Sequence, residues 1–275
     1  MRLTINHVTR YRYDVAPARI IQLLRMTPAS FDGHNVADWR IDVDCDARLR
    51  EGRDGFGNVT HMLYIDAPPG EVQVAVTGRV TTRNRHGLAA GLPEPLPPAA
   101  YLRQTPLTHP DEAIVDFAHA LEASGGSTLD KLHRLAAALN ARLSFETGQT
   151  DVDTDAATAF GAGHGVCQDF THIFLSAARV NNIPARYVSG HLYRRDGAEL
   201  QAASHAWAEA LVPDLGWVGF DPSNGISPDD AYVRVACGLD YPDAAPVSGT
   251  RTGGRGETLS VDVRVVEQAQ AQAQT

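Results

Sequence analysis

Polar and apolar residues alternate in short stretches over the first eighty positions of the chain. Residues 3–13 place apolar side chains roughly two positions apart, at Leu3, Ile5, Tyr11 and Tyr13. This period is typical of strands with one buried face. Residues 39–45, 59–66 and 71–82 alternate in the same way. The pattern predicts a run of short antiparallel strands that forms a small N-terminal β-sandwich or barrel over residues 1–84.

The pattern changes after residue 84. Residues 85–100 are rich in proline and glycine and show no period, which predicts a linker. Residues 109–123 and 127–143 then show helical spacing, with Pro110 near the start of the first helix and Ser127 or Thr128 as N-cap of the second. A third helix is predicted to begin at Cys167, with an apolar face broad enough for burial on most sides.

The second half of the chain returns to strand patterns. Strands are predicted over residues 186–193, 204–212 and 216–223, and the last two are joined by the turn PDLG. The strict alternation of residues 257–266 predicts a closing strand. Helices followed by antiparallel strands indicate an α+β unit. We therefore expect a core over residues 101–267 that includes the closing strand, and a disordered tail over residues 268–275.

Composition and net charge argue against several classes of partner and site. The chain has 275 residues and a formal net charge of -9, which argues against nucleic acid and anionic membranes as partners. Its N-terminal residues lack the apolar stretch of a signal peptide, and no run of about 18 apolar residues predicts a membrane span. We expect a cytoplasmic protein. The three cysteines form no CxxC pair, so neither a disulfide framework nor a structural zinc site is expected, and no cofactor is predicted.

Three residues that can carry out chemistry follow one another as Cys167, His205 and Asp221. The cysteine stands at a predicted helix N-terminus, a position that lowers the pKa of a thiol. The histidine and the aspartate stand on consecutive predicted strands, so the carboxylate can orient the imidazole while the other ring nitrogen faces the thiol. This arrangement predicts acyl transfer through a thioester. His164, Gly165 and Trp207 are candidates for the wall of a substrate cleft.

Each catalytic candidate also has a structural interpretation. Cys167 could be a packed core thiol, His205 a hydrogen-bonded structural histidine, and Asp221 the cap of the turn DPSN. A zinc site with His164, Cys167 and His172 is disfavoured, because positions 167 and 172 point to different sides of a helix and no fourth ligand is evident. The occurrence of all three candidates together favours catalysis.

The surrounding motifs are specific. The stretches GVCQDFTHIFLSAARVNNIPARYVSGHLY and SHAWAEALVPDLGWVGFDPSNG, with cysteine, histidine and aspartate in this order, resemble the transglutaminase-like superfamily. The resemblance is to its bacterial branch, in which a small β-rich domain precedes the core. HVTRYRYD, LLRMTP, DGFGN and VACGLDYPDAAPVSGT resemble further segments of that branch, so that the likeness covers almost the whole chain.

The resemblance implies a papain-like core, in which the helix that carries the cysteine packs on an antiparallel sheet. It further implies Cys167 as nucleophile, His205 as general base and acid, and Asp221 as the orienting carboxylate. Relatives include proteases, amidases, cross-linking enzymes and inactive copies. We expect hydrolysis of amide or isopeptide bonds in a protein or peptide substrate. Cross-linking to a lysine amine, acyl transfer from acyl-CoA and an inactive scaffold are the alternatives.

Overall fold

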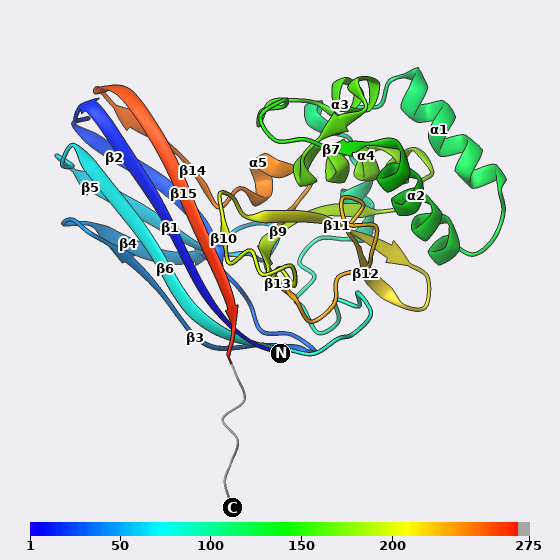
Figure 1. The fold of residues 1–275 in the computed structure, drawn as a ribbon, viewed down its shortest axis with the longest axis horizontal. Coiled ribbons are helices and arrows are strands. Elements are labelled where there is room, and N and C mark those ends of the chain that lie inside the picture. Colours follow the sequence, from blue (N-terminus) through cyan, green and yellow to red (C-terminus); the bar gives the residue numbers. More distant parts are fainter. Residues whose placement is uncertain (269–275) are drawn as a thin grey trace, which may run out of the picture.

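The computed structural model describes residues 1–268 and shows a long β-sandwich beside a unit of helices and sheet (Figure 1). The first layer of the sandwich has the strand order β10 (Leu200–Gln201), β15 (Arg255–Glu267), β1 (Arg2–Val15), β6 (Glu71–Thr82), β3 (His34–Val43). The second layer has the order β14 (Val247–Thr252), β2 (Arg19–Thr27), β5 (Val59–Asp66), β4 (Arg48–Arg53). All neighbouring strands are antiparallel, as the sequence predicts.

Strand β1 shows how the alternating pattern becomes structure. Every odd-numbered side chain from Leu3 to Tyr13 is buried, because successive side chains point to opposite faces of a strand. The two ends of this face have different neighbours. Leu3 and Ile5 join a cluster with Val233 of the second unit, whereas Tyr11 and Tyr13 belong to the core of the sandwich.

The second unit is built on a four-stranded antiparallel sheet with the order β12 (Gly216–Phe220), β11 (His205–Val212), β9 (Ala185–Leu192), β13 (Tyr232–Gly238). Its helices are α1 (Glu112–Ala123), α2 (Thr128–Arg142), α3 (Ala156–Ala162), α4 (Cys167–Val180) and α5 (Tyr241–Ala244). Two 3₁₀ turns, η1 (Pro98–Leu102) and η2 (Pro106–Thr108), and the short parallel pair β7 (Ser144–Phe145) and β8 (His164–Gly165) complete it. This unit confirms the predicted α+β class. No helix within residues 1–268 is long and apolar enough to cross a membrane.

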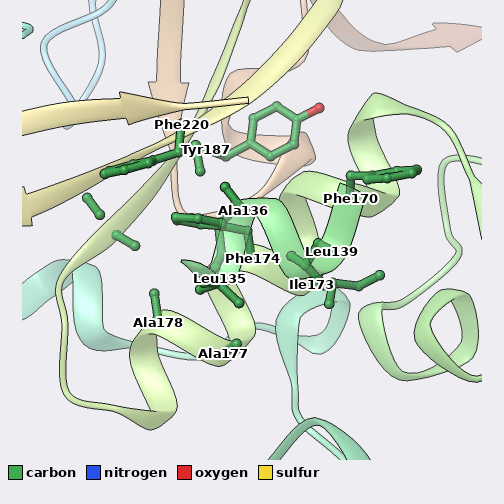
Figure 2. Packing of buried hydrophobic residues seen from close by; sticks show 14 of the residues in the cluster. Leu135, Ala136, Leu139, Phe170, Ile173, Phe174, Ala177, Ala178, Tyr187 and Phe220 are labelled. Atoms are coloured by element: carbon green, nitrogen blue, oxygen red, sulfur yellow. The ribbon is translucent and has the colours of Figure 1, made fainter. Parts of the chain in front are cut away.

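Helix α4 is the centre of this unit. Every residue from Gln168 to Arg179 is buried, since α1, α2 and α3 surround the helix on the sides that β9 and β11 leave free. Figure 2 shows Phe174 of α4 beside Phe220 of β12, with ring centroids 5.4 Å apart. Leu135 and Leu139 of α2 belong to the same cluster. The close packing fixes where the first turn of α4, and therefore Cys167, lies.

The structure corrects three predictions about domain boundaries. Strand β15 forms as expected, but it pairs with β1 from Leu3↔Glu267 to Val15↔Arg255 and so belongs to the sandwich, not to the core sheet. Residues 85–100 are not a free linker, since Ala89 N–H donates to Trp217 O (3.0 Å) and Glu94 pairs with buried Arg186 (2.8 Å). Of the predicted tail, Gln268 N–H donates to Arg2 O (2.8 Å), and residues 269–275 lie outside the described residues.

Two features account for these errors. An alternating sequence predicts a strand but not its partner, which is chosen by whichever sheet edge is open. The segment before α1 is held by individual backbone and ionic contacts that leave no periodic pattern.

Candidate active site

The structure brings Cys167, His205 and Asp221 together at one end of α4. Cys167 is the first residue of the helix, His205 is the first residue of β11, and Asp221 follows the end of β12. His205 Nε2 and Asp221 Oδ2 are 2.6 Å apart. Cys167 lies near enough to raise the pKa of the imidazole, and Nδ1, the ring nitrogen that does not face Asp221, is available to the sulfur. The three side chains therefore form a chain from sulfur to imidazole to carboxylate.

Asp221 is held on all sides. It is fully buried, and its Oδ1 accepts hydrogen bonds from Ser223 N (3.0 Å), Ser223 Oγ (2.7 Å) and Asn224 N (3.1 Å). Besides His205, Oδ2 accepts from Asn224 Nδ2 (2.8 Å) and Tyr232 OH (2.8 Å). Burial by itself raises the pKa of Asp221, but His205 and these donors outweigh it and lower the pKa to about 2. The carboxylate is thus ionised at neutral pH.

The same contacts set the charge of His205. Burial lowers the pKa of the imidazole, but the negative charge of Cys167 as a thiolate and the hydrogen bond to Asp221 outweigh burial and raise the pKa to about 10. Trp207 and Tyr232 pack against the ring, with centroids 6.2 and 5.8 Å from that of His205. An imidazolium beside a cysteine favours the thiolate, which is the nucleophilic form.

The start of α4 is fixed by Asp169. Its Oδ2 accepts from the N–H of Val166 (2.7 Å) and from Thr150 Oγ1 (2.7 Å), so the carboxylate ties the preceding loop to the helix. Burial raises the pKa of Asp169 and these hydrogen bonds oppose that rise. Because the Val166 N–H is engaged, the Cys167 N–H at the start of the helix remains the better donor for an oxyanion.

Gly165 is required by this arrangement. A Cβ at position 165 would lie 2.6 Å from Asp169 Oδ2 and 2.7 Å from Asp169 Cβ, which no real side chain tolerates. Gly165→Ala is expected to displace the first turn of α4, to cost about 1–3 kcal/mol of stability and to slow the reaction of Cys167 with thiol reagents. Thermal unfolding and alkylation rates measure the two effects. Gly161→Ala is the matched control, since a Cβ there meets nothing within 4 Å; equal effects of the two changes would contradict the role of Gly165.

Cys167 opens into a cavity of about 260 Å³ between the two units. The core contributes Cys167, His205 and Tyr187, and the sandwich contributes His7, Thr9 and Tyr11 of β1 and Leu259 and Val261 of β15. The remaining lining residues are Val152, Val166, Gln168, Ser189, Ala203, Ser204, Ala206, Tyr241, Pro246 and Val247. The sandwich is therefore one wall of the candidate active site.

The structure does not bring the three predicted cleft residues into this cavity. Among the described residues, His164, Gly165 and Trp207 do not line the cavity that holds Cys167. Trp207 is 2% exposed, and its ring packs against that of His205. The two residues are on the same face of β11, but His205 is at the end of the strand beside the cavity and Trp207 is two positions further along. His164 and Gly165 form β8, where they pair with β7 behind the first turn of α4.

Sequence reasoning missed the sandwich residues of the cavity. His7 and Thr9 could have indicated them, because these two polar residues occupy positions of β1 at which the alternation predicts buried apolar side chains. Of the residues in the disfavoured zinc site, His172 is fully buried and its Nε2 accepts from Tyr241 N (3.2 Å). Within residues 1–268, no three His, Cys, Asp or Glu side chains come together in a group that could hold a metal ion.

Comparisons with known proteins agree with this architecture. The family described as the transglutaminase-like superfamily matches residues 115–222, and the bacterial transglutaminase-like N-terminal region matches residues 3–81. The chain is 30% identical to an uncharacterized protein of Mycobacterium leprae over 98% of its own length and 99% of the relative's. It is 26% identical to an uncharacterized protein of Mycobacterium tuberculosis over 96% and 92% of the two chains.

A solved structure shows the same fold. The crystal structure of a candidate cysteine protease from Cytophaga hutchinsonii superposes with a TM-score of 0.77 at 18% identity, covering 98% of this chain and 92% of the other. Both the sandwich and the core are thus shared with one known protein. From its sequence matches and its fold, the chain belongs to the transglutaminase-like superfamily, in the form that carries the bacterial transglutaminase-like N-terminal region.

Proposed function

We propose that this protein cleaves amide bonds in peptides or proteins, as a cysteine protease or amidase that uses Cys167, His205 and Asp221. The observation that carries the proposal is the geometry of the three side chains, with His205 Nε2 2.6 Å from Asp221 Oδ2 and with Cys167 and His205 lining the same cavity. The Mycobacterium relatives have no assigned activity, whereas the Cytophaga protein is described as a candidate cysteine protease, which supports the same reaction.

The first half of the proposed reaction forms an acyl-enzyme. The Cys167 thiolate attacks the amide carbonyl carbon, and the Cys167 N–H stabilises the negative charge on the oxygen. His205 then donates its proton to the amide nitrogen, the C–N bond breaks, and the amine leaves. A thioester remains on Cys167. Asp221 stays ionised and keeps the imidazole oriented throughout.

The second half releases the acyl group. Neutral His205 takes a proton from water while the water oxygen attacks the thioester carbonyl, and the C–S bond breaks to give a carboxylic acid and the Cys167 thiolate. A lysine amine in place of water would give a cross-link by the same steps. Supplying an amine acceptor to the acyl-enzyme and weighing the product by mass spectrometry distinguishes hydrolysis from cross-linking.

Alkylation by iodoacetamide tests the proposed nucleophile. At pH 6 we expect Cys167 to react at least about tenfold faster than Cys45, because an imidazolium activates Cys167. Burial, together with Asp44 and Asp46, raises the pKa of Cys45. Site-resolved mass spectrometry measures both rates in one sample. In His205→Ala the advantage of Cys167 should disappear.

His119→Ala, the same exchange on the exposed face of α1, should leave both rates unchanged. If Cys167 reacts no faster than Cys45 in the wild-type protein, or if its rate is the same in His205→Ala, the thiolate–imidazolium pair does not form. The protein would then be a binding or scaffold member of the family.

A further inference from the structure

The cavity beside Cys167 has an unusual lining for a site between two units. Its lining residues, all within residues 1–268, include no aspartate, glutamate, lysine or arginine. Charged residues make up 21% of the whole chain, so the cavity lining contains fewer of them than the chain's composition predicts. We propose that the cavity holds an uncharged, largely apolar group of the substrate beside the attacked carbonyl, and that the wall made by β1 and β15 selects it. This inference rests on the proposed function.

The register of the two strands builds this wall. Thr9 lies opposite Val261 and Tyr11 lies opposite Leu259 in the β1–β15 pair, so these side chains stand next to one another on one face. Strand β15 lies along β1 on the side of the sandwich that is nearer the core (Figure 1). Leu259 is 54% exposed although it occupies an apolar position of the alternation. Its side chain is left open to the cavity and can be covered by a substrate.

Several polar side chains of the cavity are engaged within the protein. Ser189 Oγ donates to Ala244 O (2.6 Å), and Thr9 Oγ1 lies 3.2 Å from His7 Nε2. His7 is neutral at pH 7, because burial lowers its pKa to about 4. The positive charge of His205 is matched by the Cys167 thiolate, and the second negative charge, on Asp221, is fully buried and outside the cavity lining. A charged group in the cavity would therefore lose its hydration without gaining a counter-charge, which is unfavourable.

The volume of the cavity limits the size of the substrate group that it can hold. A volume of about 260 Å³ exceeds that of an engineered apolar cavity of about 150 Å³ that binds benzene. A branched aliphatic or an aromatic side chain therefore fits beside Cys167. An uncharged group of this kind gains from burial against Leu259, Val261 and Tyr11.

Four thiol reagents test the inference on the full chain: iodoacetamide, N-benzyl-iodoacetamide, iodoacetate and N-(2-aminoethyl)-iodoacetamide. In each reaction the Cys167 sulfur displaces iodide from the CH₂ group. Rates at Cys167 are divided by rates with glutathione, which removes intrinsic reactivity. We expect the benzyl reagent to be favoured over both charged reagents by about tenfold or more. Leu259→Asp should reduce that preference and increase the relative rate of the cationic reagent.

Ser260→Asp is the matched control, because the neighbouring residue on β15 is also exposed and points to the opposite face. It should leave all four relative rates unchanged. Equal relative rates for the four reagents, or equal effects of Leu259→Asp and Ser260→Asp, would overturn the inference. The proposed function would fail differently, by a loss of the dependence of the iodoacetamide rate on His205.

Discussion

Asp221→Asn is expected to reduce amide hydrolysis by about 10⁴-fold, as the equivalent change does in a Ser-His-Asp triad. An asparagine presents an N–H group to His205 Nε2, so the ring nitrogen must accept instead of donate. The proton then sits on Nδ1, next to the sulfur, and the imidazole can no longer take the thiol proton. Hydrolysis of a peptide-coumarin amide with an uncharged side chain, measured by fluorescence, gives the rate.

The pH profile provides a second readout of the same change. Because contacts with Cys167 and Asp221 raise the pKa of His205 to about 10, hydrolysis by the wild-type protein should fall as pH rises through about 10, when the imidazolium loses its proton. Alkylation of Cys167 needs only the thiolate and should not fall there. In Asp221→Asn this alkaline limb should move to lower pH, since the carboxylate no longer favours the imidazolium.

The matched control is Asp229→Asn, the same exchange in the loop after β12, where the carboxylate pairs with exposed Arg195 instead of His205. It should retain both the rate and the pH profile. Thermal unfolding of both variants shows whether they are folded at the assay temperature. If folded Asp221→Asn loses less than about tenfold in rate, the orienting role of the carboxylate is contradicted.

Glu209→Gln is expected to destabilise the protein by about 3–5 kcal/mol, because it removes the shared counter-charge of two buried arginines. Glu209 is 2% exposed, and its carboxylate accepts from Arg186 Nε (2.7 Å) and from Arg234 Nε (2.8 Å). The two guanidiniums lower the pKa of Glu209 to about 2 against the opposing effect of burial, so the glutamate is ionised. In the variant only Glu94 would remain, paired with Arg186.

The loss should appear as a decrease of roughly 10 °C in melting temperature. Glu71→Gln is the matched control, since it breaks an ion pair with Arg12 in which both side chains are exposed and should cost less than about 1 kcal/mol. Urea denaturation of both variants measures the free energies of unfolding. Similar values for the two variants would show that the buried network contributes no more than a surface pair.

The buried network also explains part of the fold that the sequence did not predict. Arg186 is held by Glu209 and by Glu94, and Glu94 lies in the proline-rich segment that was interpreted as a linker. Single charged residues at positions 94, 186 and 209 leave no periodic signal, because their pairing depends on the distance between strands in space. Only the tertiary structure shows that this segment is fixed to the core sheet.

The catalytic candidates could be predicted because their chemistry is local. A cysteine at a helix start, and a histidine and an aspartate on consecutive strands, are fixed by short-range patterns, and the structure places these side chains together as expected. Their supporting residues were not predicted. Tyr232 reaches Asp221 from β13, a strand that the sequence analysis did not identify.

The sequence by itself determined the type of most elements and pointed to the three catalytic candidates. Period-two alternation fixed which side chains of β1 and β15 face inward, since the pleat of a strand permits only two faces. What lies across that face was decided by the tertiary structure. The same face meets the core sheet at Leu3, the cavity at Thr9 and the second layer at Tyr13, because one long strand passes three different neighbours. Contacts between residues so far apart in the chain depend on how the units pack, which no local pattern encodes.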